Sequence, residues 1–367
     1  MHTEIVPINE WYDGLSAPLV IAGPCSAESE QQVLQTATAL AQGGGVAVFR
    51  AGVWKPRTRP GHFEGMGQQA LRWMQRVKRD TGLLTITEVA LPEHVRQVVE
   101  HGVDMVWIGA RTVASPFAMD LLAAELARAD IPVLVKNPIM PDLDLWMGAI
   151  ERLAQMGVRK LAAVHRGFYP YAQTHLRNLP KWEVPIDLRS RMPQLPMIGD
   201  PSHIAGRAEL VQGVAQHALN LSFDGLMVEV HPNPSCALSD ARQQLTPEGF
   251  GQLLRQLVFP APLRADGHYM GLIEQARDAI DSIDTQVLEL LSNRMRLIEQ
   301  IARCKRDNNV TVVQQQRWQR IRESRTEQGL SLGLSLGLSA EYISGLLELV
   351  HKESIKRQAE IIQGGAD

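Results

Sequence analysis

The sequence predicts an α/β protein made of a (β/α)8 barrel and a following all-α domain of three helices. Three observations support this prediction. Eight short apolar runs alternate with segments long enough for a helix, a proline-rich stretch interrupts the pattern at residues 259–268, and a long helical period follows. Because 367 residues exceed one barrel of roughly 250 residues, we expect two domains.

The eight apolar runs have the length and the β-branched content of buried strands. We expect the barrel to span residues 18–258, with residues 1–17 as a short N-terminal surface extension. The runs are PLVIAG, VAVFRAG, LLTITEV, MVWIG, IPVLVKN, KLAAVHRG, LPMIGD and GLMVEV. Helices are expected at residues 28–42, 65–80, 116–129, 142–156, 206–220 and 247–258. Polar residues that end such runs should meet at one rim, where the active sites of these barrels lie.

The strand signal disappears after the linker at 259–268, and residues 269–367 are expected to form the helical domain. Apolar residues keep near-helical spacing from Ile273 to Ile301, which predicts one long helix. Two shorter helices are expected near residues 314–327 and 340–362. We interpret the GLSLGLSLGLS stretch between them as a connector between helices.

The composition argues against several classes of function. The net charge is −3 and the pI is near 6.4, so no extended basic surface for nucleic acid is expected. Only three cysteines are present, which argues against a disulfide framework and favours a reducing cytoplasm. The segment MHTEIVPINEW lacks the features of a signal peptide, and no run approaches the roughly 18 apolar residues of a membrane span. We therefore expect a cytoplasmic protein without membrane partners.

Four polar residues, Cys25, His203, Glu229 and Asp240, lie within or shortly after apolar runs and offer a set of metal ligands. Together they supply one sulfur, one nitrogen and two carboxylates, which suit one divalent transition metal ion better than Ca²⁺ or Mg²⁺. The set does not distinguish Mn, Fe, Co and Zn. Two other interpretations remain open: Cys25 alone is more often a buried structural thiol, and a structural ion pair would also explain the charge of Glu229 inside an apolar run.

Fixed positive charges are the second feature of the same rim. Guanidinium and ammonium groups gathered at a barrel mouth should bind a substrate with several negative charges. The segment KPRT (55–58) also offers a cradle for a second phosphate. The cations are Arg50, Lys55, Arg57, Arg111, Lys136 and Arg166.

The motifs GPCSAES, RAGVWKPRT, TEV, GART, VKNP, HRGF, DPSH, VEVHPNP and LSDARQQL resemble those of the 3-deoxy-D-arabino-heptulosonate 7-phosphate (DAHP) synthases, type I and β-like. The resemblance implies that Cys25, His203, Glu229 and Asp240 bind the metal. It implies an erythrose 4-phosphate site at Lys55, Pro56, Arg57 and Thr58. It places phosphoenolpyruvate at Arg50, Lys55, Glu88, Gly109, Ala110, Arg111, Lys136 and Arg166.

The implied reaction joins the methylene carbon of phosphoenolpyruvate to the aldehyde of erythrose 4-phosphate, adds water at carbon 2 and releases phosphate by C–O cleavage. Lys55, or a water at the metal near Glu229, is a candidate proton source. A related family, the 3-deoxy-manno-octulosonate 8-phosphate synthases, performs the same condensation with arabinose 5-phosphate. The intact KPRT favours the four-carbon aldose.

On the long helix, Arg294 and Lys305 share a face because they are separated by about three turns, whereas Arg277 points away. Spacing alone would more often indicate a solvated face. However, LIEQARDAIDSIDTQVLELLSNRMRLIEQIARCK and AEYISGLLELVHKESIKRQ resemble the all-helical chorismate mutases. That resemblance implies a homodimer, no cofactor, and catalytic roles for Arg294, Lys305 and Gln358. The implied substrate contacts are Arg277 from the partner chain, Arg294, Lys305, Arg317, Ser354 and Gln358.

Two positions depart from the mutase pattern. Trp318 stands where a glutamate that contacts the substrate hydroxyl is usual, and Gln314 stands where an aspartate is common. The sequence therefore predicts a bifunctional enzyme of aromatic amino-acid biosynthesis, a transferase joined to an isomerase. In the alternative, the helical domain is mainly an allosteric module that senses chorismate or prephenate.

Overall fold

The computed structural model describes residues 4–56, 61, 63–170, 174–259, 268–312, 315–333 and 339–363. They form two compact units, divided between Ala261 and Pro262, and each is described by itself. The linker expected at 259–268 lies mostly outside the described residues, as do Arg57 and Thr58. No described helix is long and apolar enough to cross a membrane.

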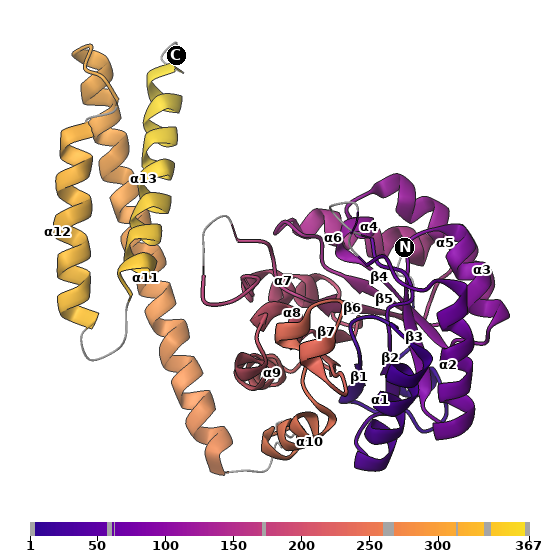
Figure 1. The fold of residues 1–367 in the computed structure, drawn as a ribbon. Coiled ribbons are helices and arrows are strands. Elements are labelled where there is room, and N and C mark those ends of the chain that lie inside the picture. The colour runs from indigo at the N-terminus through magenta and orange to yellow at the C-terminus, as the bar shows by residue number, and fades with distance from the viewer. Residues whose placement is uncertain are drawn as a thin grey trace. The chain divides into compact units, whose positions relative to one another are not determined.

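The first unit is a closed barrel of eight parallel strands, in which β8 pairs with β1 (Figure 1). Each strand lies within one of the eight apolar runs, so the predicted barrel is confirmed. The strands are β1 (Leu19–Gly23), β2 (Val48–Arg50), β3 (Leu84–Val89), β4 (Met105–Ile108), β5 (Val133–Lys136), β6 (Leu161–His165), β7 (Met197–Gly199) and β8 (Gly225–Glu229).

Helices connect the strands around the outside of the barrel (Figure 1). All six helices expected from the sequence are present, and several begin at a capping side chain: Ser29, Ser115, Asp142 and Thr246 each accept a hydrogen bond from a backbone N–H of the first turn. The helices are α1 (Glu30–Gly43), α2 (Gln68–Thr81), α3 (Pro92–Glu100), α4 (Ala110–Val113), α5 (Pro116–Ala129), α6 (Leu143–Gln155), α7 (Glu183–Arg191), α8 (Pro201–Ala205), α9 (Val211–Asn220) and α10 (Pro247–Gln256).

The N-terminal segment is not the surface extension that the sequence led us to expect. Ile8, Trp11 and Leu15 are buried and belong to the same apolar cluster as the residues that fill the barrel interior. The indole Nε1 of Trp11 donates to the carbonyl of Val6 at 2.9 Å, and the hydroxyl of Tyr12 donates to the carbonyl of Asp104 at 2.7 Å. These side chains extend the core because the barrel leaves apolar side chains at one end that need cover.

The described residues of the second unit form three helices, as predicted: α11 (His268–Asp307), α12 (Gln315–Gly333) and α13 (Ala340–Gln363). One detail differs from the sequence interpretation. Helix α12 continues to Gly333, so the first part of the leucine-glycine-serine stretch is helical rather than a connector. Leucine favours helix and offsets the low helix propensity of Gly329, whereas the second glycine, Gly333, is the last residue of the helix.

Candidate functional site

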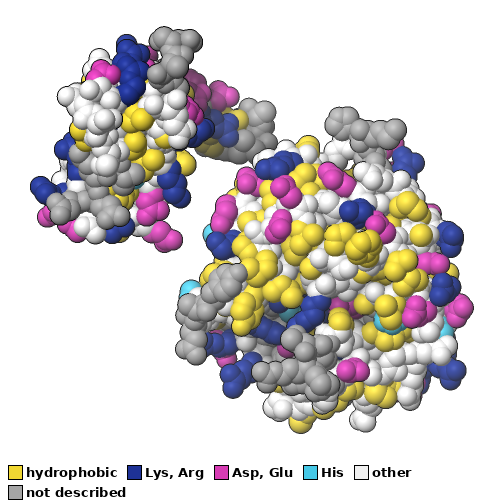
Figure 2. Space-filling model, turned by 90° about the horizontal axis from the view of Figure 1, so that it is seen from above, with side chains coloured by type: hydrophobic (Ala, Val, Ile, Leu, Met, Phe, Trp, Pro, Cys, Tyr) yellow, Lys and Arg dark blue, Asp and Glu magenta, His cyan; other side chains and the backbone are white. Residues whose placement is uncertain are grey.

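A cavity of about 510 Å³ opens at the carboxyl ends of the barrel strands. Figure 2 shows Lys and Arg side chains gathered in the hollow of the larger unit, with hydrophobic side chains around them. Most of the predicted barrel residues line it. The lining residues are Lys55, Pro56, Glu88, Gly109, Ala110, Arg111, Lys136, Ile139, Arg166, Tyr169, Arg177, Asn178, His203 and Asp240.

His203 and Asp240 line this cavity, and the buried side chains of Cys25 and Glu229 lie beside them. The Cys25 Sγ lies 3.4 Å from Asp240 Oδ2, and ligand atoms of Cys25, Glu229 and Asp240 all lie within 4.8 Å of one another. His203 Nε2 is 3.7 Å from Glu229 Oε1 and 3.7 Å from Asp240 Oδ2. Ligands that share one ion, with bonds of about 2.0 to 2.3 Å, lie roughly 3 to 4 Å apart. Ligand atoms of Cys25, Glu229 and Asp240 are therefore close enough to share one metal ion, and His203 Nε2 lies beside the two carboxylates.

The orientation of His203 is set by a neighbouring carboxylate. Its Nδ1 lies 2.8 Å from Asp200 Oδ2, so a proton assigned to Nδ1 leaves the Nε2 lone pair facing Glu229 and Asp240. Burial lowers the pKa of His203 despite the opposing effect of Asp200. The ring is therefore neutral near pH 7, which is the form that binds a metal.

Burial acts in the same direction on the thiol of Cys25 and the carboxyl group of Asp240, but neighbouring charges give the two groups opposite net pKa shifts. Burial, followed by the charge of Glu229, raises the pKa of Cys25 to about 12. Burial also acts to raise the pKa of Asp240, but Arg177 and His203 outweigh it, and the pKa falls below its usual value. Asp240 has φ 50° and ψ 34°, a left-handed conformation that is uncommon for a residue with a side chain. A cation would favour the thiolate that burial disfavours.

Arg50 links the proposed metal ligands, Cys25, His203, Glu229 and Asp240, to the rest of the cavity. Its Nη2 donates to Glu229 Oε1 at 3.0 Å, and both side chains are 0% exposed. Its guanidinium carbon lies 4.9 Å from the Trp107 ring centroid. Among the described residues, its Nε and Nη1 have no hydrogen-bond partner. Buried donors left unpaired are costly, so this side chain is suited to an anionic ligand.

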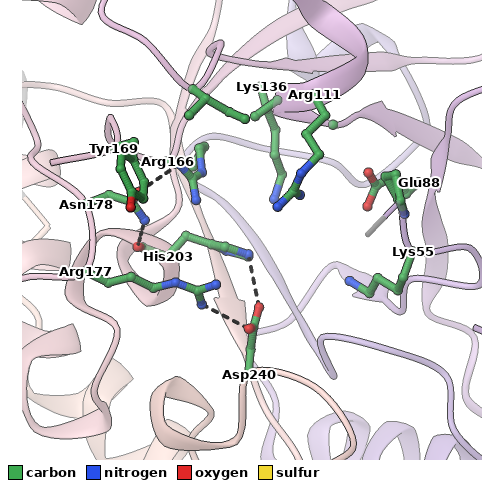
Figure 3. Close-up of a pocket in the computed structure, with 14 residues that line it drawn as sticks. Lys55, Glu88, Arg111, Lys136, Arg166, Tyr169, Arg177, Asn178, His203 and Asp240 are labelled. Atoms are coloured by element: carbon green, nitrogen blue, oxygen red, sulfur yellow. Dashed lines mark hydrogen bonds and ion pairs between the residues drawn. The ribbon is translucent and has the colours of Figure 1, made fainter. Parts of the chain in front are cut away.

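The remaining cations form a dense positive wall. Lys136 Nζ lies 2.8 Å from Asp200 Oδ2. The pKa of Arg166 falls to about 10, chiefly because of burial; the charges of Arg177 and Arg111 act in the same direction, and the charge of Asp200 opposes them. Such mutual repulsion is relieved when an anion binds between the cations. Figure 3 shows the Lys55 and Lys136 side chains directed into the same space.

Gly109 has a steric role at this wall. A Cβ on this residue would overlap the carboxylate of Glu88. Glycine therefore permits the backbone after β4 to lie close to the Glu88 side chain. Ala110 and Arg111 follow it in the short helix α4.

The sequence interpretation missed four lining residues: Ile139, Tyr169, Arg177 and Asn178. Arg177 Nη1 lies 3.0 Å from Asp240 Oδ1, and Asn178 Oδ1 accepts a hydrogen bond from Arg166 at 3.0 Å (Figure 3). Both lie in the long connection between β6 and α7, where no strand end marks them. The length of that connection is the only signal that could have pointed to them, because long loops often carry function.

In the helical unit, four of the predicted residues meet in two pairs. Arg294 Nη1 donates to Ser354 Oγ at 2.5 Å, and Lys305 Nζ donates to Gln358 Oε1 at 3.1 Å. Ser354 and Gln358 are buried. Burial lowers the pKa of Arg294, whereas burial and the charge of Arg317 lower that of Lys305.

Three other positions complete this description. Arg277 is exposed and has no hydrogen bond or ion pair with another described residue. Trp318 stacks on His351 of α13, with ring centroids 3.7 Å apart and planes at 4°. Gln314 lies outside the described residues.

Comparisons with known proteins agree with the two units. A model of the DAHP synthetase I family matches residues 6–258, and a model of chorismate mutase type II matches residues 276–359. The chain is 33% identical over 238 residues to phospho-2-dehydro-3-deoxyheptonate aldolase of Thermotoga maritima, covering 65% of this chain and 68% of that protein. It is 29% identical over 260 residues to 2-dehydro-3-deoxyphosphooctonate aldolase of Desulfotalea psychrophila, covering 65% and 88%.

Solved structures give the same result for the barrel. The crystal structure of the Thermotoga maritima phospho-2-dehydro-3-deoxyheptonate aldolase (DAHP synthase) matches with a TM-score of 0.60 and 29% identity, covering 70% of this chain and 72% of that chain. A truncated form of 3-deoxy-D-arabino-heptulosonate 7-phosphate synthase from the same organism matches with a TM-score of 0.59 and 28% identity, covering 70% and 91%.

Proposed function

We propose a bifunctional activity for this chain, which belongs to the DAHP synthetase I family and carries a C-terminal chorismate mutase type II domain. The barrel would condense phosphoenolpyruvate, erythrose 4-phosphate and one water to DAHP and phosphate. The helical unit would rearrange chorismate to prephenate. Both are reactions of the shikimate pathway, and we place the enzyme in the cytoplasm.

The observation that carries the barrel proposal is the contact between Arg50 and Glu229. It joins a buried guanidinium with unused donors to a group that fits a metal. An anionic substrate held by Arg50 would therefore lie beside the proposed metal ligands. This arrangement suits a reaction in which a phosphorylated enol and an aldehyde must meet.

A divalent metal held by Cys25, His203, Glu229 and Asp240 would supply Lewis acidity toward the aldehyde oxygen. The side chains of the protein would bind the substrates and transfer the proton. Arg50 and the cations of the cavity wall hold the phosphate and carboxylate of phosphoenolpyruvate. Lys55 lines the cavity, and its Nζ would hold and deliver a proton there.

The aldose substrate is the finer part of the proposal. Lys55 and Pro56 line the cavity and begin the KPRT segment, which favours erythrose 4-phosphate. The similarity to octulosonate-type aldolases makes arabinose 5-phosphate the second candidate. Purified protein, loaded with Mn²⁺, should release phosphate from phosphoenolpyruvate with erythrose 4-phosphate. A comparable or faster rate with arabinose 5-phosphate would overturn the assignment.

For the mutase, the supporting observation is the pairing of two cations with buried amide and hydroxyl partners. Arg294 would hold a carboxylate, and Lys305 with Gln358 would stabilise negative charge on the ether oxygen as the bond breaks. This pericyclic step needs no cofactor. Arg317 would add positive charge near Lys305.

The mutase proposal includes a homodimer. An apolar stripe on α11 is exposed in the single chain and has spacings of three and four residues, typical of a helix that packs against a partner. Arg294 falls within the same spacing, so a second copy on this stripe would approach the site and bring its own Arg277. The stripe consists of Ile280, Ile283, Val287, Leu290, Leu297 and Ile301.

The alternative function keeps the fold and changes the role of the helical unit. The same cations would bind chorismate or prephenate and regulate the barrel without turnover. Trp318 at a position where an acidic residue is usual favours this alternative. Conversion of chorismate by the intact protein, lost in Arg294→Ala, would support the mutase. Binding without conversion, together with altered synthase activity, would support the sensor.

A further inference from the structure

We propose that His351, stacked on Trp318, contacts the ring hydroxyl of chorismate and makes the helical site specific for it. This inference rests on the proposed mutase or chorismate-binding function and names a residue that the sequence interpretation did not include. The stack joins α12 to α13, and its nearly parallel rings are 3.7 Å apart.

His351 belongs to the same face of α13 as the two buried polar residues of the site. It precedes Ser354 by three residues and Gln358 by seven, spacings that place all three side chains in one line along a helix. Arg294 of α11, which donates to Ser354, also lies close enough to lower the pKa of His351 after burial. Side chains of all three helices therefore meet around His351.

The polar groups of chorismate can be matched with those of the site. Its two carboxylates require cations, which Arg294 and Arg317 can provide, and the ether oxygen requires donors, which Lys305 and Gln358 provide. The hydroxyl requires an acceptor. Ser354 already donates to the carbonyl of Val350 and accepts from Arg294. Beside this group, the imidazole of His351 offers an acceptor nitrogen in its neutral form.

Trp318 has a positioning role in this arrangement. An indole cannot accept the hydrogen bond of a hydroxyl at its N–H, so Trp318 itself does not replace an acidic residue. Its flat face instead fixes the plane of the His351 ring. The pair thus provides an acceptor without adding negative charge beside Arg294.

The test compares His351→Leu and His351→Gln with the intact protein, using chorismate and an analogue in which hydrogen replaces the ring hydroxyl. Dissociation constants come from calorimetry and kcat/KM from the loss of chorismate absorbance. We expect His351→Leu to weaken binding or kcat/KM for chorismate about 3- to 10-fold and to leave the analogue within about twofold. His351→Gln, which keeps an acceptor, should recover part of the loss.

Lys352→Leu is the matched control, because this exposed neighbour on α13 has no part in the proposed site. Equal losses for chorismate and the analogue would indicate a purely structural role for His351 and overturn the proposal, as would no loss for chorismate. If the intact protein neither converts nor binds chorismate, that result contradicts the function proposed for the helical unit, and with it the role of His351. Helical circular dichroism of each variant verifies folding.

Discussion

Arg50 donates to Glu229 through a 3.0 Å contact in which neither side chain is exposed to solvent. Glu229 Oε2 also accepts a hydrogen bond from Gln243 at 2.7 Å. One carboxylate thus joins the positively charged cavity to the group that fits a metal. Substrate binding and metal binding are therefore expected to depend on each other, because both use Glu229 or its direct partner.

Arg50→Met should both destabilise the barrel and abolish phosphoenolpyruvate binding. The change leaves the buried charge of Glu229 without its cation, which costs about 3 kcal/mol in unfolding free energy. Urea unfolding and calorimetry with phosphoenolpyruvate measure the two effects. Arg76→Met is the control, since Arg76 pairs with Glu30 at the surface and should cost less than about 1 kcal/mol. Normal phosphoenolpyruvate affinity in Arg50→Met would contradict the assignment.

Cys25→Ala should lower metal affinity and synthase activity while leaving the mutase unchanged. The buried thiol lies 3.4 Å from Asp240, and its loss removes the only sulfur of the proposed ligand set. Metal content after dialysis against dilute chelator measures the effect, with both activities assayed on the same samples. Cys236→Ala is the matched control because that thiol is exposed. Equal metal loss in the two variants would count against Cys25 as a ligand.

His165 should make the barrel sensitive to acid. The ring is fully buried, with the Trp182 ring centroid 5.2 Å away, and burial lowers its pKa to about 3. An unfolded histidine has a pKa near 6.5, so the folded state binds fewer protons between these values. Its contribution to stability is present above about pH 6.5 and is lost as the pH falls toward 3. This residue adds a slope of up to about 1.4 kcal/mol per pH unit to the dependence of the unfolding free energy on pH.

His165→Leu should therefore flatten the dependence of unfolding free energy on pH between about 4 and 6. Urea unfolding followed by tryptophan fluorescence at several pH values gives this slope. His175→Leu serves as the control, since His175 is exposed. An unchanged slope in His165→Leu would show that other groups cause the acid sensitivity.

Ile283→Lys combined with Leu290→Lys should convert a dimer to a monomer and remove mutase activity. The substitutions place charges in the apolar stripe of α11, where Ile283 is 57% and Leu290 67% exposed in the single chain. Light scattering after size exclusion measures the mass. Leu121→Lys on α5 is the control, because its side chain is also largely exposed but lies on the barrel. A variant that stays dimeric would place the interface elsewhere.

The local pattern of the sequence was sufficient to locate every strand of the barrel. A buried parallel strand is a short apolar run bounded by polar or flexible residues, and this signal does not depend on distant contacts. Because such strands are parallel, residues at their ends share one rim, so the sequence also predicted most of the cavity lining. The sequence did not predict Arg177 and Asn178, because they lie in a long connection without such a pattern.

The sequence by itself determined the barrel, the three-helix unit and the chemical types gathered at the strand ends, since these follow from periodicity and from the geometry of parallel strands. Only the tertiary structure decided which side chains pair. It brought Arg177 to Asp240, placed Trp11 in the barrel core and stacked Trp318 on His351. These contacts join residues of different segments, and their energies depend on the approach of surfaces that no local pattern specifies.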